Sequence, residues 1–207
     1  MDLIPSWVNV ALILFTVWIG VVRETRLAMT GYILQVVSLL VLYLYQIFQT
    51  GESGAFIGWS ALLIIRLIAI PILIYSFLKK SWWHDRVTSD LIDVRKAVPL
   101  YAFLAIFGFM MGRGTGDFIG TAVSVLLLGI SIVLLKHDPS KQVFGILSVD
   151  AAGDLMVIYF LNRLPLFFEI LIYLIILWSA VCMVILVKSI ERRTKVRSVK
   201  QLTNLKG

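Results

Sequence analysis

Long apolar runs, separated by short polar segments, form the main pattern of this sequence. A transmembrane helix needs about 20 predominantly apolar residues. Seven stretches of roughly this length lie at positions 6–22, 29–48, 56–78, 97–112, 117–135, 142–161 and 167–188. The fourth is short, and it can begin before Pro99, because proline is favoured in the first turn of a helix. The pattern predicts an all-α, polytopic bundle of seven transmembrane helices.

The polar segments between these runs contain the glycine, proline, asparagine and aspartate that favour loops. The longest of these segments is KKSWWHDRVTSDLIDVRK. It ends a region of three helices and a cytoplasmic loop at 1–96. A four-helix region follows at 97–190, and a basic tail at 191–207. Trp82 and Trp83 favour an interfacial helix in this loop, since tryptophan prefers the headgroup level. A docking surface for a soluble partner is the alternative. We find no convincing internal repeat.

Lysine and arginine are distributed very unevenly between the two sides of the predicted bundle. The side reached after the first, third, fifth and seventh stretches holds 16 of the 19, counted with Lys188 at the end of the seventh. The other side holds only Arg113 and Arg163, and the nineteenth, Arg66, lies inside a stretch. Cytoplasmic loops carry the excess of positive charge in membrane proteins. We therefore expect the N-terminus outside and the C-terminal tail in the cytoplasm. The net charge of +7 then reports topology, and nucleic-acid binding is not expected.

The composition supports a membrane protein and argues against a catalytic site of its own. The chain is 60% apolar and 15% charged, with a mean hydropathy of +0.95. No basic segment precedes the first apolar run, which predicts a membrane helix and no cleaved signal. Cys182 has no partner for a disulfide or metal site, and we expect it to pack in the core. His84 and His137 stand alone in loops, and no nucleophile–base pair, metal-ligand cluster or phosphate-binding loop is present.

Four ionisable residues fall inside the predicted membrane helices. Arg66 lies near the middle of the third stretch, Asp150 and Asp154 lie in the middle of the sixth, and Glu169 lies about one turn into the seventh. A charge at the centre of a bilayer costs about 2.5–3.5 kcal/mol on insertion scales. Such residues usually face a bundle interior or a water path, so these four are the candidate functional residues.

The spacing of the two aspartates predicts how they act. Positions i and i+4 share one helix face, about 6 Å apart along the axis, and the small residues 151–153 allow a helix or water to approach the carboxyl groups. Two such acids exchange protons as a coupled unit, and Arg66 can keep one of them ionised. The alternative is structural: a buried pair of Arg66 and Asp150 that fixes helix register, a protonated and hydrogen-bonded Asp154, and a Glu169 that reaches the outer interface.

The second half of the chain resembles the hydrogenase-4 component E family. The resemblance rests on SKQVFGILSVDAAGDLMVIYFLNRLPLFFEIL, in which a loop leads into a helix with an acid, small residues, a Leu-Pro-Leu turn and a glutamate. The matching positions are Gly145, Asp150, Gly153, Pro165 and Glu169. This half is also similar to the K-type subunit of respiratory complex I and to the C-type subunit of multisubunit cation/proton antiporters.

In the first half, ALLIIRLIAIPILIYSFLKK resembles the family's basic residue followed by a proline, with Arg66 in place of lysine and Pro71 matching. Other positions depart from the family pattern. Asp150 stands where the family tends to have glutamate, the usual acid late in the last span is replaced by apolar residues around Ile175, and Asp154 has no counterpart. Two readings stay open: the chain conducts protons itself, or it completes a channel shared with neighbours.

The resemblance implies a membrane-arm subunit of a complex-I-like, energy-converting assembly, of the [NiFe] hydrogenase or formate hydrogenlyase type, in a prokaryotic cytoplasmic membrane. Its partners would be antiporter-like and quinone-module-like membrane subunits and soluble hydrogenase-type subunits, which would hold the redox cofactors. Asp150, Asp154, Glu169 and Arg66 would take part in proton or Na⁺ translocation. A non-conducting assembly subunit is the alternative, and a stand-alone small transporter is a third, weaker one.

Overall fold

The computed structural model describes residues 3–51, 55–78, 94–112, 116–136, 139–159 and 166–194. Within these ranges every regular element is a helix. The helices are α1 (Leu3–Val21), α2 (Thr25–Thr50), α3 (Ala55–Leu62), the π-helix η1 (Leu63–Ala69), α4 (Ile70–Leu78), α5 (Val94–Gly112), α6 (Asp117–Leu135), α7 (Pro139–Tyr159) and α8 (Leu166–Thr194).

Each predicted apolar stretch coincides with one continuous helical rod. The three elements α3, η1 and α4 follow one another without a gap, so that the described helices form seven rods. The helix α5 begins at Val94, which places Pro99 in its second turn and not in its first. The expected start before the proline is therefore confirmed, whereas the expected position of the proline in the first turn is wrong.

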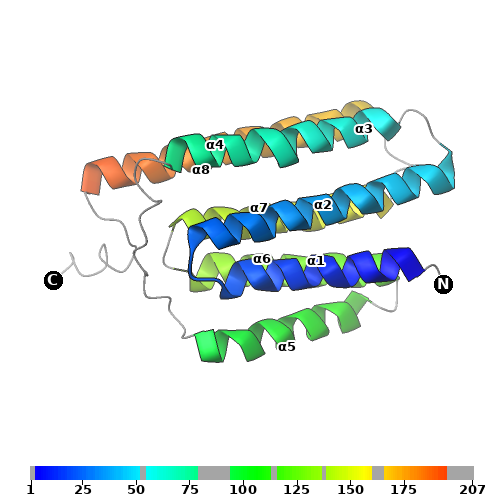
Figure 1. The fold of residues 1–207 in the computed structure, drawn as a ribbon, viewed down its shortest axis with the longest axis horizontal. Coiled ribbons are helices and arrows are strands. Elements are labelled where there is room, and N and C mark those ends of the chain that lie inside the picture. Colours follow the sequence, from blue (N-terminus) through cyan, green and yellow to red (C-terminus); the bar gives the residue numbers. More distant parts are fainter. Residues whose placement is uncertain are drawn as a thin grey trace.

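The rods pack as two layers of antiparallel helices (Figure 1). The first layer contains α1, α2 and the rod α3–η1–α4, and the second contains α6, α7 and α8. Each helix of the first layer lies against its counterpart in the second, and α5 packs at the edge against α1 and α6. Along the chain, α5 follows the three rods of the first layer and precedes the three rods of the second. Because of this extra rod, each helix of the second layer runs in the same direction as the helix that it packs against in the first. The fold therefore repeats a three-rod order that the sequence pattern did not reveal.

The outer surface of this bundle is apolar. Among the residues that the structure describes, four helical segments are long and apolar enough to cross a membrane: Thr25–Gln49, Phe56–Ser76, Asp117–Leu135 and Lys141–Tyr159. Shorter apolar stretches lie in α1, α5 and α8. Large side chains such as Phe48, Met110 and Trp178 are more than two-thirds exposed. An exposed apolar surface of this extent fits an environment of lipid or partner protein and not water.

Small residues bring α5 and α6 unusually close together. A Cβ atom added to Gly108 of α5 would lie 2.6 Å from the Cα atom of Ser124 in α6, and one added to Gly112 would lie 2.3 Å from the Cα atom of Gly120. The Ser124 hydroxyl lies 2.8 Å from the carbonyl oxygen of Ala105 and can donate a hydrogen bond to it. This is the small-residue packing by which membrane helices approach each other.

Cys182 corrects one expectation. The cysteine is exposed on the surface of α8 and not packed in the core, because an apolar neighbourhood in sequence does not separate the inward face of a membrane helix from its outward face. Several other predictions fall outside the described residues: the interfacial helix of Trp82 and Trp83, the loop histidines His84 and His137, the charges Arg113 and Arg163, and the end of the tail at 195–207.

Candidate functional site

Arg66 lies in a π-helical turn whose geometry follows from Pro71. In the π-helix the N–H of Ile70 donates to the carbonyl of Ile65, five residues back. In the same register the carbonyl of Arg66 would accept from residue 71, but proline has no N–H. In an α-helical register the ring of Pro71 would instead clash with the carbonyl of Leu67. The wider turn therefore lies directly before the proline, and it leaves the Arg66 carbonyl without a helical donor.

Tyr32 of α2 supplies the missing donor. Its hydroxyl group lies 3.3 Å from the Arg66 carbonyl oxygen and donates to it. The Tyr32 side chain is fully buried, and its ring contacts that of Phe144 in α7, with 6.0 Å between the ring centroids. A π-helical turn in a longer helix often marks a functional site, and here a second helix stabilises it.

The Arg66 guanidinium reaches across the bundle to α7. Its Nε atom lies 2.8 Å from Oδ2 of Asp154, and both side chains have no solvent exposure. The Nε–H does not point at the oxygen with hydrogen-bond geometry, so the contact is an ion pair without an aligned hydrogen bond. A second nitrogen, Nη1, donates to the carbonyl oxygen of Leu147 at 3.4 Å. The structure thus pairs Arg66 with Asp154, and not with Asp150 as the structural alternative supposed.

Several polar atoms around this pair are buried without a hydrogen-bond partner among the described residues. They are Nη2 of Arg66, Oδ1 of Asp154 and Oδ2 of Asp150. Buried polar groups in proteins are normally satisfied, and ordered water commonly supplies the missing partner. The cluster therefore has the polar lining that a water-mediated proton path requires, close to the mid-length of α7.

Asp150 lies between this buried pair and the outside of the bundle. The residue is half-buried, lies one turn before Asp154 on the same face of α7, and interacts electrostatically with Arg66. The neighbouring Gly153 is exposed, and a Cβ atom added to it would meet nothing within 4 Å. Only one of the three small residues leaves space beside the carboxyl group. Ala151 and Ala152 pack against the core, whereas the space beside Gly153 is open.

A second polar layer connects three helices in the core. Gln35 of α2 donates from Nε2 to the hydroxyl oxygen of Thr16 in α1 at 2.9 Å. The Ser148 hydroxyl of α7 lies 3.4 Å from Oε1 of Gln35 and 2.9 Å from the carbonyl oxygen of Phe144, so it donates to one or the other. All three polar side chains are buried. The apolar pattern of the sequence does not predict this layer, although an uncharged amide in the middle of an apolar stretch is a usable signal.

The four predicted site residues are only partly brought together. Arg66, Asp150 and Asp154 form one cluster, whereas Glu169 lies in α8, and its side chain falls outside the described residues. Tyr173 of the same helix is buried and interacts electrostatically with Arg66. Among the described side chains, no group of three His, Cys, Asp or Glu residues could hold a metal ion.

Comparison with known proteins adds no assignment. No protein-family model, no curated protein and no solved structure matches this chain.

Proposed function

We propose that this chain is a membrane-arm subunit of a complex-I-related, energy-converting complex of the hydrogenase or formate hydrogenlyase type. In this proposal it crosses the membrane seven times, with the N-terminus outside. Asp150, Asp154 and Glu169 contribute protonatable groups to the translocation of H⁺ or Na⁺, and Arg66 is the permanent positive charge whose position shifts when the neighbouring subunits change state. Redox chemistry takes place in partner subunits. The proposal rests on the resemblance of the sequence and on the chemistry of the cluster.

The observation that carries the proposal is the buried pair of Arg66 and Asp154, one turn from the half-buried Asp150. In this arrangement a proton reaches Asp150 from the open side of α7 and passes by way of water to Asp154. A change in the neighbouring subunits that moves the guanidinium changes how strongly Asp154 holds the proton. Translocation of one charge costs about 2.3 kcal/mol per 100 mV of membrane potential, so a modest change in proton affinity is sufficient.

The exposure of Asp150 also supports a partner subunit. The residue lies near mid-length in an apolar helix and is half-buried, with its Oδ2 atom enclosed. An ionisable group that stays partly open to lipid at this depth is costly. A neighbouring protein over Gly153 would cover Asp150 and connect it to the rest of a proton path. The position of Asp150 therefore favours a complex over a stand-alone transporter.

The test uses membrane vesicles that contain the whole complex. Asp150→Asn and Asp154→Asn should each abolish redox-driven proton uptake, measured with a pH-sensitive dye, while electron transfer is partly retained. Glu24→Gln is a matched control, because it removes a carboxylate at the start of α2, distant in sequence from the cluster. Proton uptake at the normal rate in both aspartate variants would refute the translocation role.

The alternative is a non-conducting assembly subunit, in which the buried pair only fixes helix register. The double variant Arg66→Leu/Asp154→Leu separates the two functions, because it removes the ion pair without leaving an unpaired buried charge. An assembly subunit loses the complex on a native gel, whereas a conducting subunit assembles and fails to translocate protons. The proteins that co-purify in mild detergent test the wider assignment: a large subunit with nickel-binding cysteines supports it, and purification as a single active transporter contradicts it.

A further inference from the structure

Among the described residues, two fully buried tyrosine side chains interact with Arg66. The Tyr32 hydroxyl group of α2 donates its hydrogen to the carbonyl oxygen of Arg66. Tyr173 of α8 is also fully buried, lies in the same hydrophobic cluster as Tyr32, and interacts electrostatically with Arg66. Its hydroxyl group brings a further polar group to the charged cluster, from a helix that contributes neither member of the ion pair.

Tyr173 lies at a similar depth in the bundle to Asp154. The helices α7 and α8 pack against each other and run in opposite directions. Asp154 lies five residues before the last residue of α7, and Tyr173 lies seven residues after the first residue of α8. At 1.5 Å per residue these positions are about 8 Å and about 11 Å from the end where the two helices follow one another. The two side chains therefore belong to one layer, and Arg66 interacts with both.

The buried face of α8 leads from Tyr173 to the position of Glu169. The buried residues of α8 are spaced three or four apart, which marks one face of a helix; they are Tyr173, Ile176, Ala180 and Val184. Position 169 is four residues before Tyr173, so it lies on the same face, one turn nearer the start of the helix. In the proposed orientation the start of α8 is its external end. The order Asp154, Tyr173 and Glu169 therefore runs toward the outside.

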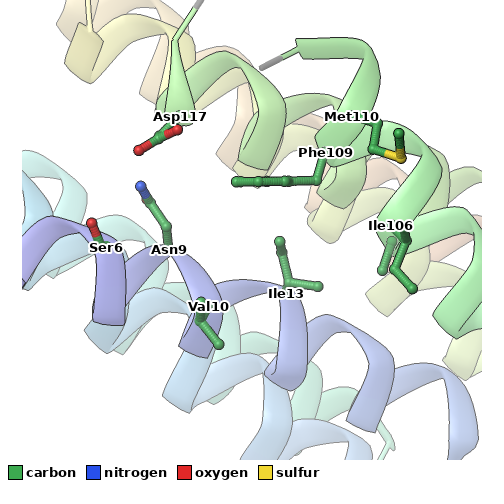
Figure 2. A pocket seen from close by; sticks show the side chains of 9 residues that line it. Ser6, Asn9, Val10, Ile13, Ile106, Phe109, Met110 and Asp117 are labelled. Atoms are coloured by element: carbon green, nitrogen blue, oxygen red, sulfur yellow. The ribbon is translucent and has the colours of Figure 1, made fainter.

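The pocket between α1, α5 and α6 does not continue this path. Its volume is about 300 Å³, and at one end the amide nitrogen of Asn9 faces Asp117 (Figure 2). None of its lining residues belongs to the Arg66 cluster. Buried apolar residues of α1, α6 and α7 pack together in the core, among them Leu12, Val125 and Leu155. Because apolar side chains cannot carry a proton, the inward face of α8 is the better continuation.

We propose that Tyr173 is a proton-carrying residue of the translocation path and connects Asp154 to Glu169. The inference rests on the proposed function, because it needs Asp154 to exchange a proton. When Asp154 releases its proton, the Tyr173 oxygen accepts it by way of a water molecule, and the hydroxyl group releases its own proton toward Glu169. One O–H bond of the tyrosine forms and one breaks, so the side chain is neutral before and after the transfer. Tyr32 does not act in this way while its hydroxyl hydrogen is donated to the Arg66 carbonyl.

The test uses membrane vesicles that contain the whole complex, with rates expressed per assembled complex. Tyr173→Phe keeps the aromatic ring and removes only the hydroxyl group, so the complex should be recovered in normal amount on a native gel. Redox-driven proton uptake should fall about tenfold or more, because a positioned proton-transfer group is lost. Tyr101→Phe is the matched control, since it removes the hydroxyl group of another buried tyrosine, in α5, which contributes no residue to the cluster. Its proton uptake should be unchanged.

Tyr173→His separates a proton carrier from a residue that only packs. Imidazole exchanges protons near neutral pH, whereas phenylalanine fills the space of the tyrosine ring more completely. A proton carrier predicts faster proton uptake in the histidine variant than in the phenylalanine variant. A packing role predicts the reverse order, and that result would overturn the inference.

The remaining outcomes distinguish this inference from the proposed function. If Asp154→Asn abolishes proton uptake and Tyr173→Phe leaves it at the normal rate, Tyr173 is not part of the path and the proposed function stands. Loss of the assembled complex in Tyr173→Phe would also overturn the inference, because the hydroxyl group is then required for folding. Normal proton uptake in both Asp150→Asn and Asp154→Asn would instead refute the proposed function itself.

Discussion

The hydroxyl group of Tyr32 lies 3.3 Å from the carbonyl oxygen of Arg66, the carbonyl whose π-helical donor would be the missing N–H of Pro71. The hydrogen bond therefore joins α2 to η1 at the residue whose side chain forms the buried ion pair. The backbone of Arg66 is held from one side and its guanidinium from the other. The position of the charge in the core depends on both contacts.

Replacing Tyr32 by phenylalanine should destabilise the protein by about 1–3 kcal/mol, because a buried carbonyl then loses its donor. In a Pro71→Ala background residue 71 regains an N–H that can donate to the Arg66 carbonyl, so the same Tyr32→Phe change should cost less. Unfolding free energies of the four proteins in mild detergent give the coupling directly. Equal costs in both backgrounds would contradict the assignment of this hydrogen bond.

The two glycines Gly153 and Gly108 should respond in opposite ways to alanine. A Cβ atom at Gly153 meets nothing within 4 Å, whereas one at Gly108 lies 2.6 Å from the backbone of Ser124. Gly153→Ala should raise the stability of the isolated chain by up to about 1 kcal/mol through helix propensity. Gly108→Ala should lower it, because α5 and α6 must separate.

A bulkier change at Gly153 tests the partner surface. Gly153→Leu should leave the isolated chain folded and reduce recovery of the complex on a native gel, if a neighbouring subunit covers this face of α7. Full recovery of the complex with normal proton uptake would show that the space beside Asp150 stays uncovered.

The apolar pattern predicted the positions of all seven rods because a chain in lipid must satisfy its backbone within helices, which leaves long uninterrupted apolar runs. The i, i+4 spacing likewise predicted that Asp150 and Asp154 share a face. It did not predict which aspartate pairs with Arg66. This depends on how α7 is rotated about its own axis and on where η1 places the guanidinium.

Features that depend on contacts between distant helices were not predictable in this way. Pro71 is visible in the sequence, but the π-helical turn before it also depends on a donor from Tyr32 in another helix. No local pattern indicates that contact. Cys182 was placed in the core because its neighbours are apolar, and a helix that is apolar all round gives no signal for its inward face.

Replacing Gln35 by leucine should cost little, about 1 kcal/mol or less. The change removes the Gln35 amide, so the hydroxyl groups of Thr16 and Ser148 lose one hydrogen-bond partner. Each hydroxyl group has an alternative acceptor within its own helix. The Thr16 hydroxyl lies 2.7 Å from the Leu12 carbonyl oxygen, and the Ser148 hydroxyl lies 2.9 Å from that of Phe144. Gln35→Glu should be far more harmful, because it places a carboxylate in the core. Thermal unfolding of the two variants tests the contrast.

The proposed orientation can be tested with single cysteines. In a Cys182→Ser background, Ser6→Cys and Glu24→Cys place a thiol near each end of α1, at residues that are exposed. An impermeant maleimide applied to intact cells should label position 6 and not position 24. An external N-terminus would be contradicted if position 24 is labelled in intact cells and position 6 is not. It would also be contradicted if both positions are labelled only after the membrane is opened.

The contribution of the Arg66–Asp154 ion pair to stability can be measured separately from transport. Removing either partner leaves an uncompensated buried charge, so Arg66→Leu and Asp154→Leu should each destabilise the protein by about 3–5 kcal/mol. The double variant should be more stable than either single variant, since a buried pair replaced by apolar residues costs little or even stabilises. Additive losses would mean that the two side chains do not interact. A stable double variant that still assembles but fails to translocate protons would show that the pair is retained for ion transport and not for folding.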